Sequence, residues 1–361
     1  MNKRRCSSIV GFTILLFSLS LCAEEELTVV SWGGSYAKAC IDGFFIPFEK
    51  ETGIKVNVEN YNGGLAPIRA QVESGNVFWD VVDVESHEDL IGCDEGLLEY
   101  LGDLELPDSP DGTSAEEDYF EHANSECGVG TIVWATITAY NSSNYETDPP
   151  TMISDFFDLE KYPGKRGMRR MPQVNLEFAL MADGVPPEDV YDVLSTDEGI
   201  DRAFKKLDTI KDSLVFWEAG AQPPQLLADN EVAITTAYNG RIFNAINLEK
   251  QPFAIVWDGH VRDYGQLVIV AGSPNLENAK KFLQFAARST SMVGISNRIS
   301  YAPLRHSAWK LVGKHVDTHI EMKPHMPTAP QNSKHFLIND AKWWAEHQDD
   351  LFERFTAWLS R

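Results

Sequence analysis

Aromatic and acidic side chains occur together near the predicted ends of several strands. An aromatic face attracts an ammonium ion through its quadrupole, and a carboxylate neutralises and hydrogen-bonds the same ion. In open α/β sheets, ligands sit beyond the carboxyl ends of the strands. These positions therefore predict a site for an amine-containing solute. The candidate ligand-binding residues are Trp32, Tyr36, Asp83, Glu85, Trp134, Trp217, Glu218, Tyr238, Arg241, Trp257, Asp258 and Tyr301.

The Gly33-Gly34-Ser35 turn could bind an anionic group instead of an amine. Ser35 is placed to cap the helix that follows, and backbone N–H groups at the start of a helix suit an anionic group. Arg241, which follows Asn239-Gly240, could supply a second contact to an anion. A zwitterionic or anionic solute, such as an amino acid, an opine or an amino-phosphonate, is therefore the alternative to a simple amine.

Catalytic and cofactor signatures are missing from the sequence. It contains no Gly-x-Ser-x-Gly elbow, no P-loop and no dinucleotide-binding glycine fingerprint. His87-Glu88 begins a zinc-protease pattern that fails at Ile91, where the second histidine should stand. We therefore expect no catalytic residue, no metal and no cofactor. A secreted hydrolase that uses two acids of the same cleft is the remaining alternative.

The charge of the chain excludes one class of partner, and its length indicates the number of lobes. Its 361 residues include 54 acidic and 31 basic ones, for a formal net charge of −23. A field of this sign repels phosphate backbones, so no nucleic-acid partner is expected. Single cores stop growing near about 250 to 300 residues, so the length suits two lobes. Two lobes imply a cleft in which a solute can bind.

Residues 1–23 are predicted to be an export signal. Basic residues at positions 3–5 precede an apolar stretch from Ile9 to Cys22, and Ala23 is a small residue before an acidic run. The stretch is shorter than the roughly 20 residues that span a bilayer. We therefore expect a periplasmic protein, with a lipid anchor at Cys22 as the rival to cleavage after Ala23.

Three cysteines follow the predicted signal, and an oxidising compartment allows one disulfide among them. Cys93 and Cys127 both lie in polar, turn-rich surroundings, so we expect these two to pair. Cys40 lies among small and apolar residues on a predicted helix, which indicates a buried free thiol.

The predicted elements alternate between strand and helix. Strands at 27–32, 54–58 and 79–84 are separated by helices at 35–52 and 65–74. This order is typical of a parallel sheet with crossover helices, so the fold class is α/β.

A β-rich run at 130–140 is long enough to pass from one lobe to the other. We expect lobe 1 to comprise residues 24–138 and 262–301. Lobe 2 is expected to comprise residues 139–261 and 302–361, with helices at its C-terminal end.

Several stretches resemble the periplasmic solute-binding proteins of ABC importers, in particular the spermidine/putrescine-binding family. They are Trp32-Gly33-Gly34-Ser35-Tyr36, residues 48–56, residues 79–83, Ala139-Tyr140-Asn141 and residues 278–283. The resemblance implies a type II-like binding-protein fold, in which each lobe is a mainly parallel sheet with flanking helices and the ligand lies between. It also implies delivery of the solute to a permease in the inner membrane.

The resemblance further assigns roles to single residues. It matches Trp32 and Tyr36 to aromatic contacts of the first lobe and Trp217 and Trp257 to those of the second lobe and hinge, and it puts Asp258 near an amine-binding acid. The resulting prediction is a monomeric receptor that closes on a polyamine-like amine. The solute contacts both lobes and therefore favours the closed arrangement, which the permease recognises.

Overall fold

The computed structural model describes residues 25–361, so the predicted signal and Cys22 lie outside the described residues. One sheet of ten strands runs through the molecule in the order β2-β1-β3-β8-β4-β7-β5-β6, with β10 beside β8 and β9 beside β4. The strands are β1 (Glu26–Ser31), β2 (Lys55–Asn60), β3 (Val81–Glu85), β4 (Gly128–Asn141), β5 (Arg166–Arg169), β6 (Leu214–Trp217), β7 (Ile234–Tyr238), β8 (Phe253–Ile269), β9 (Ala302–Pro303) and β10 (Phe336–Ile338).

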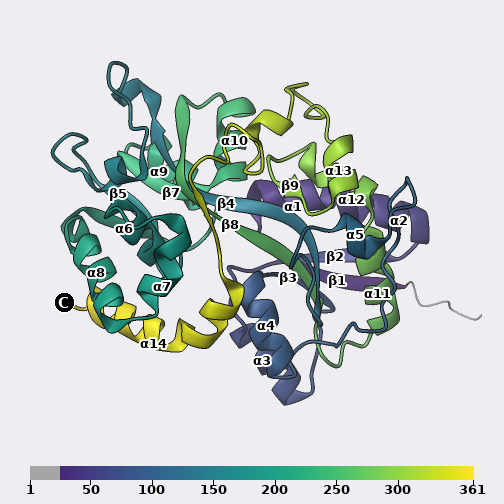
Figure 1. Cartoon of the computed structure of the whole chain (residues 1–361). Coiled ribbons are helices and arrows are strands. Elements are labelled where there is room, and N and C mark those ends of the chain that lie inside the picture. The colour runs from purple at the N-terminus through teal and green to yellow at the C-terminus, as the bar shows by residue number, and fades with distance from the viewer. Residues whose placement is uncertain (1–24) are drawn as a thin grey trace, which may run out of the picture.

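Helices cover the sheet in both halves of the molecule, which we call the first lobe (around β1, β2 and β3) and the second lobe (around β5, β6 and β7) (Figure 1). The helices are α1 (Gly34–Cys40), α2 (Ile46–Thr52), α3 (Ala66–Ser74), α4 (Ser86–Asp94), α5 (Ala115–Asp118), α6 (Asn175–Ala182), α7 (Val190–Leu194), α8 (Asp197–Asp208), α9 (Gln222–Ala228), α10 (Asn239–Asn247), α11 (Leu276–Ala286), α12 (Ser289–Ser296), α13 (His306–Leu311) and α14 (Ala341–Leu359). The predicted two-lobed α/β fold is confirmed.

The first lobe has the parallel strands that the alternation predicted. β1 pairs in parallel with β2, Leu27 opposite Val56, and with β3, Val29 opposite Val81. The predicted helix at 35–52 is present as α1, a π-helical turn (Ile41–Phe45) and α2. Its N-cap is Gly33, without a side-chain hydrogen bond, so the expected cap at Ser35 is wrong.

Two long antiparallel strands, β4 and β8, join the lobes (Figure 1). They pair from Gly128 opposite Val268 to Asn141 opposite Phe253, so the run predicted to cross does cross. The register shifts between Thr136 and Thr138, where residues 257–260 of β8 lie opposite the single residue Ile137 of β4. This irregularity reorients the side chains of β8 beside the interlobe region.

Two large hydrophobic clusters form the main cores. The first includes Phe48 and Phe282, and the second includes Phe178 and Trp344. Residues 302–326 contribute to the first core, although the expected division placed them in lobe 2. The reason is β9, which pairs with β4 at Ile132 and Val133 and thereby holds the following segment over the first lobe. The chain returns to the second lobe only through β10 and α14.

The disulfide prediction is confirmed: Cys93 and Cys127 are bonded, with their Cα atoms 5.8 Å apart. Cys40 is a buried free thiol, as expected. Within residues 25–361, no helix has the length and apolar character needed to cross a membrane.

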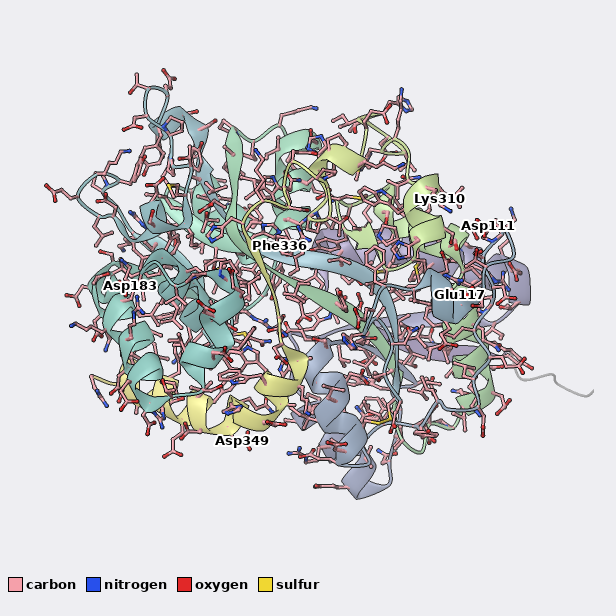
Figure 2. The ribbon with its side chains drawn as sticks, viewed as in Figure 1. Asp111, Glu117, Asp183, Lys310, Phe336 and Asp349 are labelled. Atoms are coloured by element: carbon pink, nitrogen blue, oxygen red, sulfur yellow. A yellow bond between two sulfur atoms is a disulfide. The ribbon has the colours of Figure 1, made fainter. Side chains whose placement is uncertain are left out.

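The large negative charge lies mainly on the outside. Asp111, Glu117, Asp183 and Asp349 are exposed, and Figure 2 shows them spread around the molecule. Charge of this kind keeps a protein soluble. The acids relevant to solute binding are the buried ones, such as Asp83 and Glu85.

Candidate ligand-binding site

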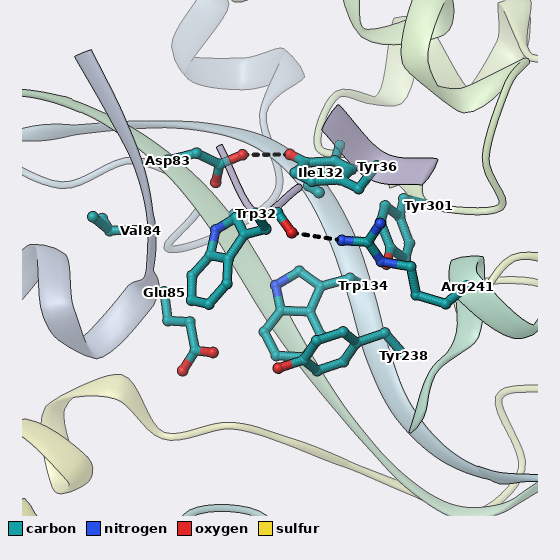
Figure 3. A pocket seen from close by; sticks show the side chains of 11 residues that line it. Trp32, Tyr36, Asp83, Val84, Glu85, Ile132, Trp134, Tyr238, Arg241 and Tyr301 are labelled. Carbon is teal, nitrogen blue, oxygen red and sulfur yellow. Dashed lines mark hydrogen bonds between the residues drawn. The ribbon is translucent and has the colours of Figure 1, made fainter. Parts of the chain in front are cut away.

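A pocket lies between the ends of β1 and β3, the middle of β4, and α10. The space between its atoms is about 370 Å³, a volume that includes solvent at its open side. The candidates that line it are Trp32, Tyr36, Asp83, Glu85, Trp134, Tyr238, Arg241 and Tyr301. Figure 3 shows them around a common space, with Glu85 and Arg241 at opposite sides of the view. The tertiary structure thus brings together residues that are separated by up to 269 positions in the sequence.

The acidic side of the pocket comes from β3. Asp83 and Glu85 are two residues apart on a strand, so both side chains leave the same face of the sheet. The hydroxyl of Tyr36 donates a 2.5 Å hydrogen bond to Asp83 Oδ2. Burial raises the pKa of Asp83 to about 7, although this hydrogen bond and one from Trp32 favour the charged form. Asp83 is therefore able to exchange a proton near neutral pH.

Glu85 is paired with a residue that the sequence analysis did not single out. Arg169, at the carboxyl end of β5, places its Nη1 2.5 Å from Glu85 Oε1 across the interlobe space. Its guanidinium lies 5.7 Å from the ring of Trp32 and 5.9 Å from that of Tyr238. The rule that ligands sit at strand ends would have found Arg169, had the four-residue strand β5 been recognised.

The basic side of the pocket is formed by Arg241, from the first turns of α10. Its Nη1 donates to Gly33 O at 2.7 Å, and its Nη2 donates to Trp32 O at 3.1 Å. A Cβ atom at Gly34, where φ is +56°, would lie 2.9 Å from Nη1, so the glycine turn is what admits the guanidinium. Arg241 Nε is buried and has no hydrogen-bond partner in the part of the chain that the structure describes, which leaves one donor for an anion.

Aromatic rings form the wall between the acidic and basic sides. Tyr238 packs edge-on against Trp134 at 5.0 Å and against Trp217 at 5.4 Å between ring centroids. Tyr36 and Tyr301 pack in the same manner at 5.4 Å. In Figure 3, Trp32, Trp134 and Tyr238 lie between Glu85 and Arg241. Rings of this kind suit both an alkyl chain and an ammonium group.

Trp217 lines a smaller cavity that shares Glu85 and Trp134 with the main pocket; the space between its atoms is about 280 Å³, including solvent at its open side. The sequence reasoning missed Gln173 and Thr236, which also line it. Trp217 Nε1, Gln173 Oε1 and Thr236 Oγ1 are buried and have no hydrogen-bond partner among residues 25–361. Unpaired buried polar atoms are costly, so this cavity is suited to water or to a polar part of the solute.

Three sequence candidates lie elsewhere. Glu218 is exposed and lines a wide outer groove, where its carboxylate is 3.9 Å from Arg170. Asp258 accepts 2.9 Å hydrogen bonds from Ile153 N and His335 Nδ1, and Trp257 packs against His260. Trp257 and Asp258 lie at the register shift of β8, and neither is among the residues that line the pocket.

Glu85, His87 and Asp263 form a buried group whose potential ligand atoms lie within 4.8 Å of one another. Protein groups already engage it: Arg169 pairs with Glu85, and Ser86 and the N–H of Tyr264 donate to Asp263. Burial lowers the pKa of His87 to about 4 and raises that of Asp263, because it disfavours the charged form of each group. This geometry could hold a metal ion only by displacing those contacts.

The chain is similar to several known proteins. A family model described as "Bacterial extracellular solute-binding protein" matches residues 44–328. The "Gamma-aminobutyric acid-binding protein" of Pseudomonas aeruginosa PAO1 is 41% identical over 351 residues, which cover 96% of each chain.

Solved structures agree with the family match. The PBP MotA from A. tumefaciens B6, in complex with glucopine, has a TM-score of 0.82 at 29% identity and covers 92% of this chain and 99% of that one. A structure described as a GABA receptor has a TM-score of 0.77 at 29% identity, over 93% of this chain and 98% of that one. The chain therefore belongs to the bacterial extracellular solute-binding proteins, which serve ABC importers and are not enzymes.

Proposed function

We propose that this protein is the ABC-importer receptor for a small ω-amino acid of the 4-aminobutyric acid (GABA) type. The observation that carries the proposal is the opposition of charges across the pocket, with Asp83 and Glu85 on one side and Arg241 on the other. A solute with an ammonium at one end and a carboxylate at the other satisfies both sides. A polyamine offers no anion to Arg241, so the zwitterionic alternative is better supported than the polyamine-like amine.

Each part of the solute has a partner in this arrangement. The ammonium faces Asp83 and Glu85, and its charge favours loss of the proton from Asp83. The short alkyl chain lies against Trp134 and Tyr238. The carboxylate faces Arg241, whose Nε has no other partner. Relatives named for binding GABA support a solute of this size and charge.

Closure follows from contacts that span the lobes. Arg241 follows β7 of the second lobe and contacts Trp32 and Gly33, which follow β1 of the first. Arg169 from β5 reaches Glu85 on β3 in the same way. A solute held from both lobes binds the closed arrangement more tightly than an open one and therefore shifts the population toward it. A membrane permease would recognise that closed form.

A binding series tests the proposal directly. The melting temperature and calorimetric Kd are measured with 4-aminobutyrate, 5-aminopentanoate, butyrate, butylamine and putrescine, since a ligand of the folded state raises the melting temperature. We expect binding of the two amino acids and losses of about 100-fold or more for compounds that lack one charged end, because an unpaired buried charge remains in the site. Tighter binding of putrescine than of 4-aminobutyrate would overturn the proposal.

A further inference from the structure

The pocket is separated from a much larger space by one ion pair. An outer groove of about 1360 Å³ lies between α3 and α4 of the first lobe and α14 of the second. Arg169 lines both this groove and the small inner cavity, whereas Glu85 lines both the inner cavity and the main pocket. The Glu85–Arg169 pair thus lies where the inner and outer spaces meet.

The pair is held firmly in place. The Arg169 side chain is 15% exposed and that of Glu85 is 4% exposed. Arg169 Nη2 also donates to the carbonyl of Asn62 at 3.4 Å, and its guanidinium lies over Trp32. Trp32 is packed in turn against Gly63, where a Cβ atom would lie only 2.6 Å from the ring. The wall between pocket and groove is therefore closed on the Trp32 side as well as by the ion pair.

The chemistry of the solute places its nitrogen next to this wall. The ammonium of an ω-amino acid at Glu85 has three N–H bonds, and a substituent on that nitrogen must replace one of them. In this closed form, the route from Glu85 to the groove passes Arg169. The groove itself suits a polar substituent, since its charged residues include Arg69, Glu88, Glu95, Arg170, Glu218 and Asp349.

We propose that the Glu85–Arg169 pair is a selectivity gate that excludes secondary-amine amino acids, and that the outer groove accepts the nitrogen substituent only when Arg169 no longer closes the gate. With the gate closed, the receptor selects primary ω-amino acids. With Arg169 shortened, a polar chain on the nitrogen extends past Glu85 into the groove. This inference rests on the proposed function, because it requires the solute nitrogen to lie at Glu85.

The experiment compares two ligands in matched variants. Kd is measured by calorimetry for 4-aminobutyrate and for 4-[(2-hydroxyethyl)amino]butyrate with the unmodified protein, Arg169→Ser, Arg169→Gln and Arg169→Lys. Arg202→Ala is the control, because Arg202 is an exposed arginine that pairs with Asp183 and lines neither the pocket nor the groove. The readout is the ratio of the Kd for the substituted ligand to the Kd for the parent, which cancels a general loss of closure.

We expect the ratio of the two Kd values to fall by roughly tenfold or more in Arg169→Ser, because the short serine side chain no longer blocks the substituent. The ratio should fall by less in Arg169→Gln, whose side chain is longer. Arg169→Lys, which keeps a long side chain, and Arg202→Ala should keep the ratio of the unmodified protein. Should Arg169→Ser fail to fold, the comparison of Arg169→Gln with Arg169→Lys serves the same purpose.

An unchanged ratio in the folded shortened variants, with 4-aminobutyrate still bound by the unmodified protein, overturns the gate alone. Failure of the unmodified protein to bind any ω-amino acid overturns the proposed function and the gate with it.

Discussion

The inner pocket and the outer groove differ in the properties that decide binding. The pocket is small, about 370 Å³, and its polar groups are buried among aromatic rings. The groove is larger, about 1360 Å³, and its ion pair between Arg69 and Glu95 is exposed to solvent. Exposed pairs are worth little because water and salt screen them, whereas a buried unpaired group is costly to leave unmatched. Size alone therefore does not identify the binding site.

Loss of the disulfide would test whether the two regions are independent. The Cys93→Ser/Cys127→Ser variant should lower the free energy of unfolding by about 3 to 4 kcal/mol, because the unfolded chain regains the freedom of the loop. Cys93 lies in α4, whose residues Glu88 and Ile91 line the groove. Denaturant unfolding measures the loss, with Cys40→Ala as a control that keeps the bond. A changed order of ligand affinities would show that the groove wall also shapes the pocket.

Replacement of Arg241 should have the largest effect on affinity. Arg241→Ala removes the partner of the solute carboxylate and two hydrogen bonds between the lobes, so we expect the Kd for 4-aminobutyrate to rise by about 100-fold. Arg69→Ala removes an arginine from the groove rather than from the pocket, and it should change the Kd for 4-aminobutyrate by less than about twofold. Calorimetry distinguishes the two. Equal effects of the two replacements would contradict the distinction between the two regions.

The pKa of Asp83, about 7, predicts a pH dependence of binding. Below this pH the carboxyl is protonated and cannot neutralise an ammonium, so affinity for 4-aminobutyrate should rise as pH increases from 6 to 8, by about tenfold. Asp83→Asn should bind more weakly at pH 8 and lose this dependence. Glu88 faces the groove and also has its pKa raised to about 7 by burial, so Glu88→Gln is the control that should keep the dependence.

The stability of the ligand-free protein should depend on pH in the opposite direction: affinity rises with pH, whereas the contribution of Asp83 to stability falls. The pKa of Asp83 is higher in the folded state than the ordinary 3.8, so the folded protein holds this proton more tightly than the unfolded chain. The contribution of Asp83 to stability is therefore complete below pH 3.8 and is lost as pH rises through about 7. Comparison of unfolding free energies of the unmodified protein and Asp83→Asn across this range measures it. A difference that does not vary with pH would contradict the raised pKa.

The smallest effect is expected at Glu218. Its side chain is 68% exposed, so Glu218→Gln should leave the Kd for 4-aminobutyrate within about twofold. The neighbouring Trp217→Phe, which removes a buried indole N–H beside the pocket, should weaken binding by about tenfold if that N–H meets the solute or its bound water. Similar Kd values for both variants would show that the inner cavity does not take part in binding.

Much of the fold could be predicted because its signals are local. The apolar run predicted as a strand at 27–32 is β1 at 26–31, and that at 79–84 overlaps β3 at 81–85. Both Asp83 and Glu85 lie inside β3, where their spacing of two residues places them on one face of the sheet. The short strand β5 had no comparable pattern, and Arg169 was missed with it.

The candidate site depended on features that the local sequence does not carry. Trp257 and Asp258 satisfied the strand-end rule as well as Trp32 did, yet the register shift of β8 against β4 removes them from the pocket. The shift is a property of two strands that are more than 100 residues apart, so neither strand shows it alone. The same holds for residues 302–326, whose lobe is decided by the pairing of β9 with β4.

The sequence by itself determined the α/β class, the crossing strand, the disulfide partners and most of the pocket residues, because periodicity, turn chemistry and residue type act over short distances. Only the tertiary structure decided which side chains meet. It brought Arg241 to the glycine turn and Arg169 to Glu85, and it set the distance between opposite charges. The reason is physical: solute choice depends on the burial and separation of charges from different lobes, and both arise only when the chain packs.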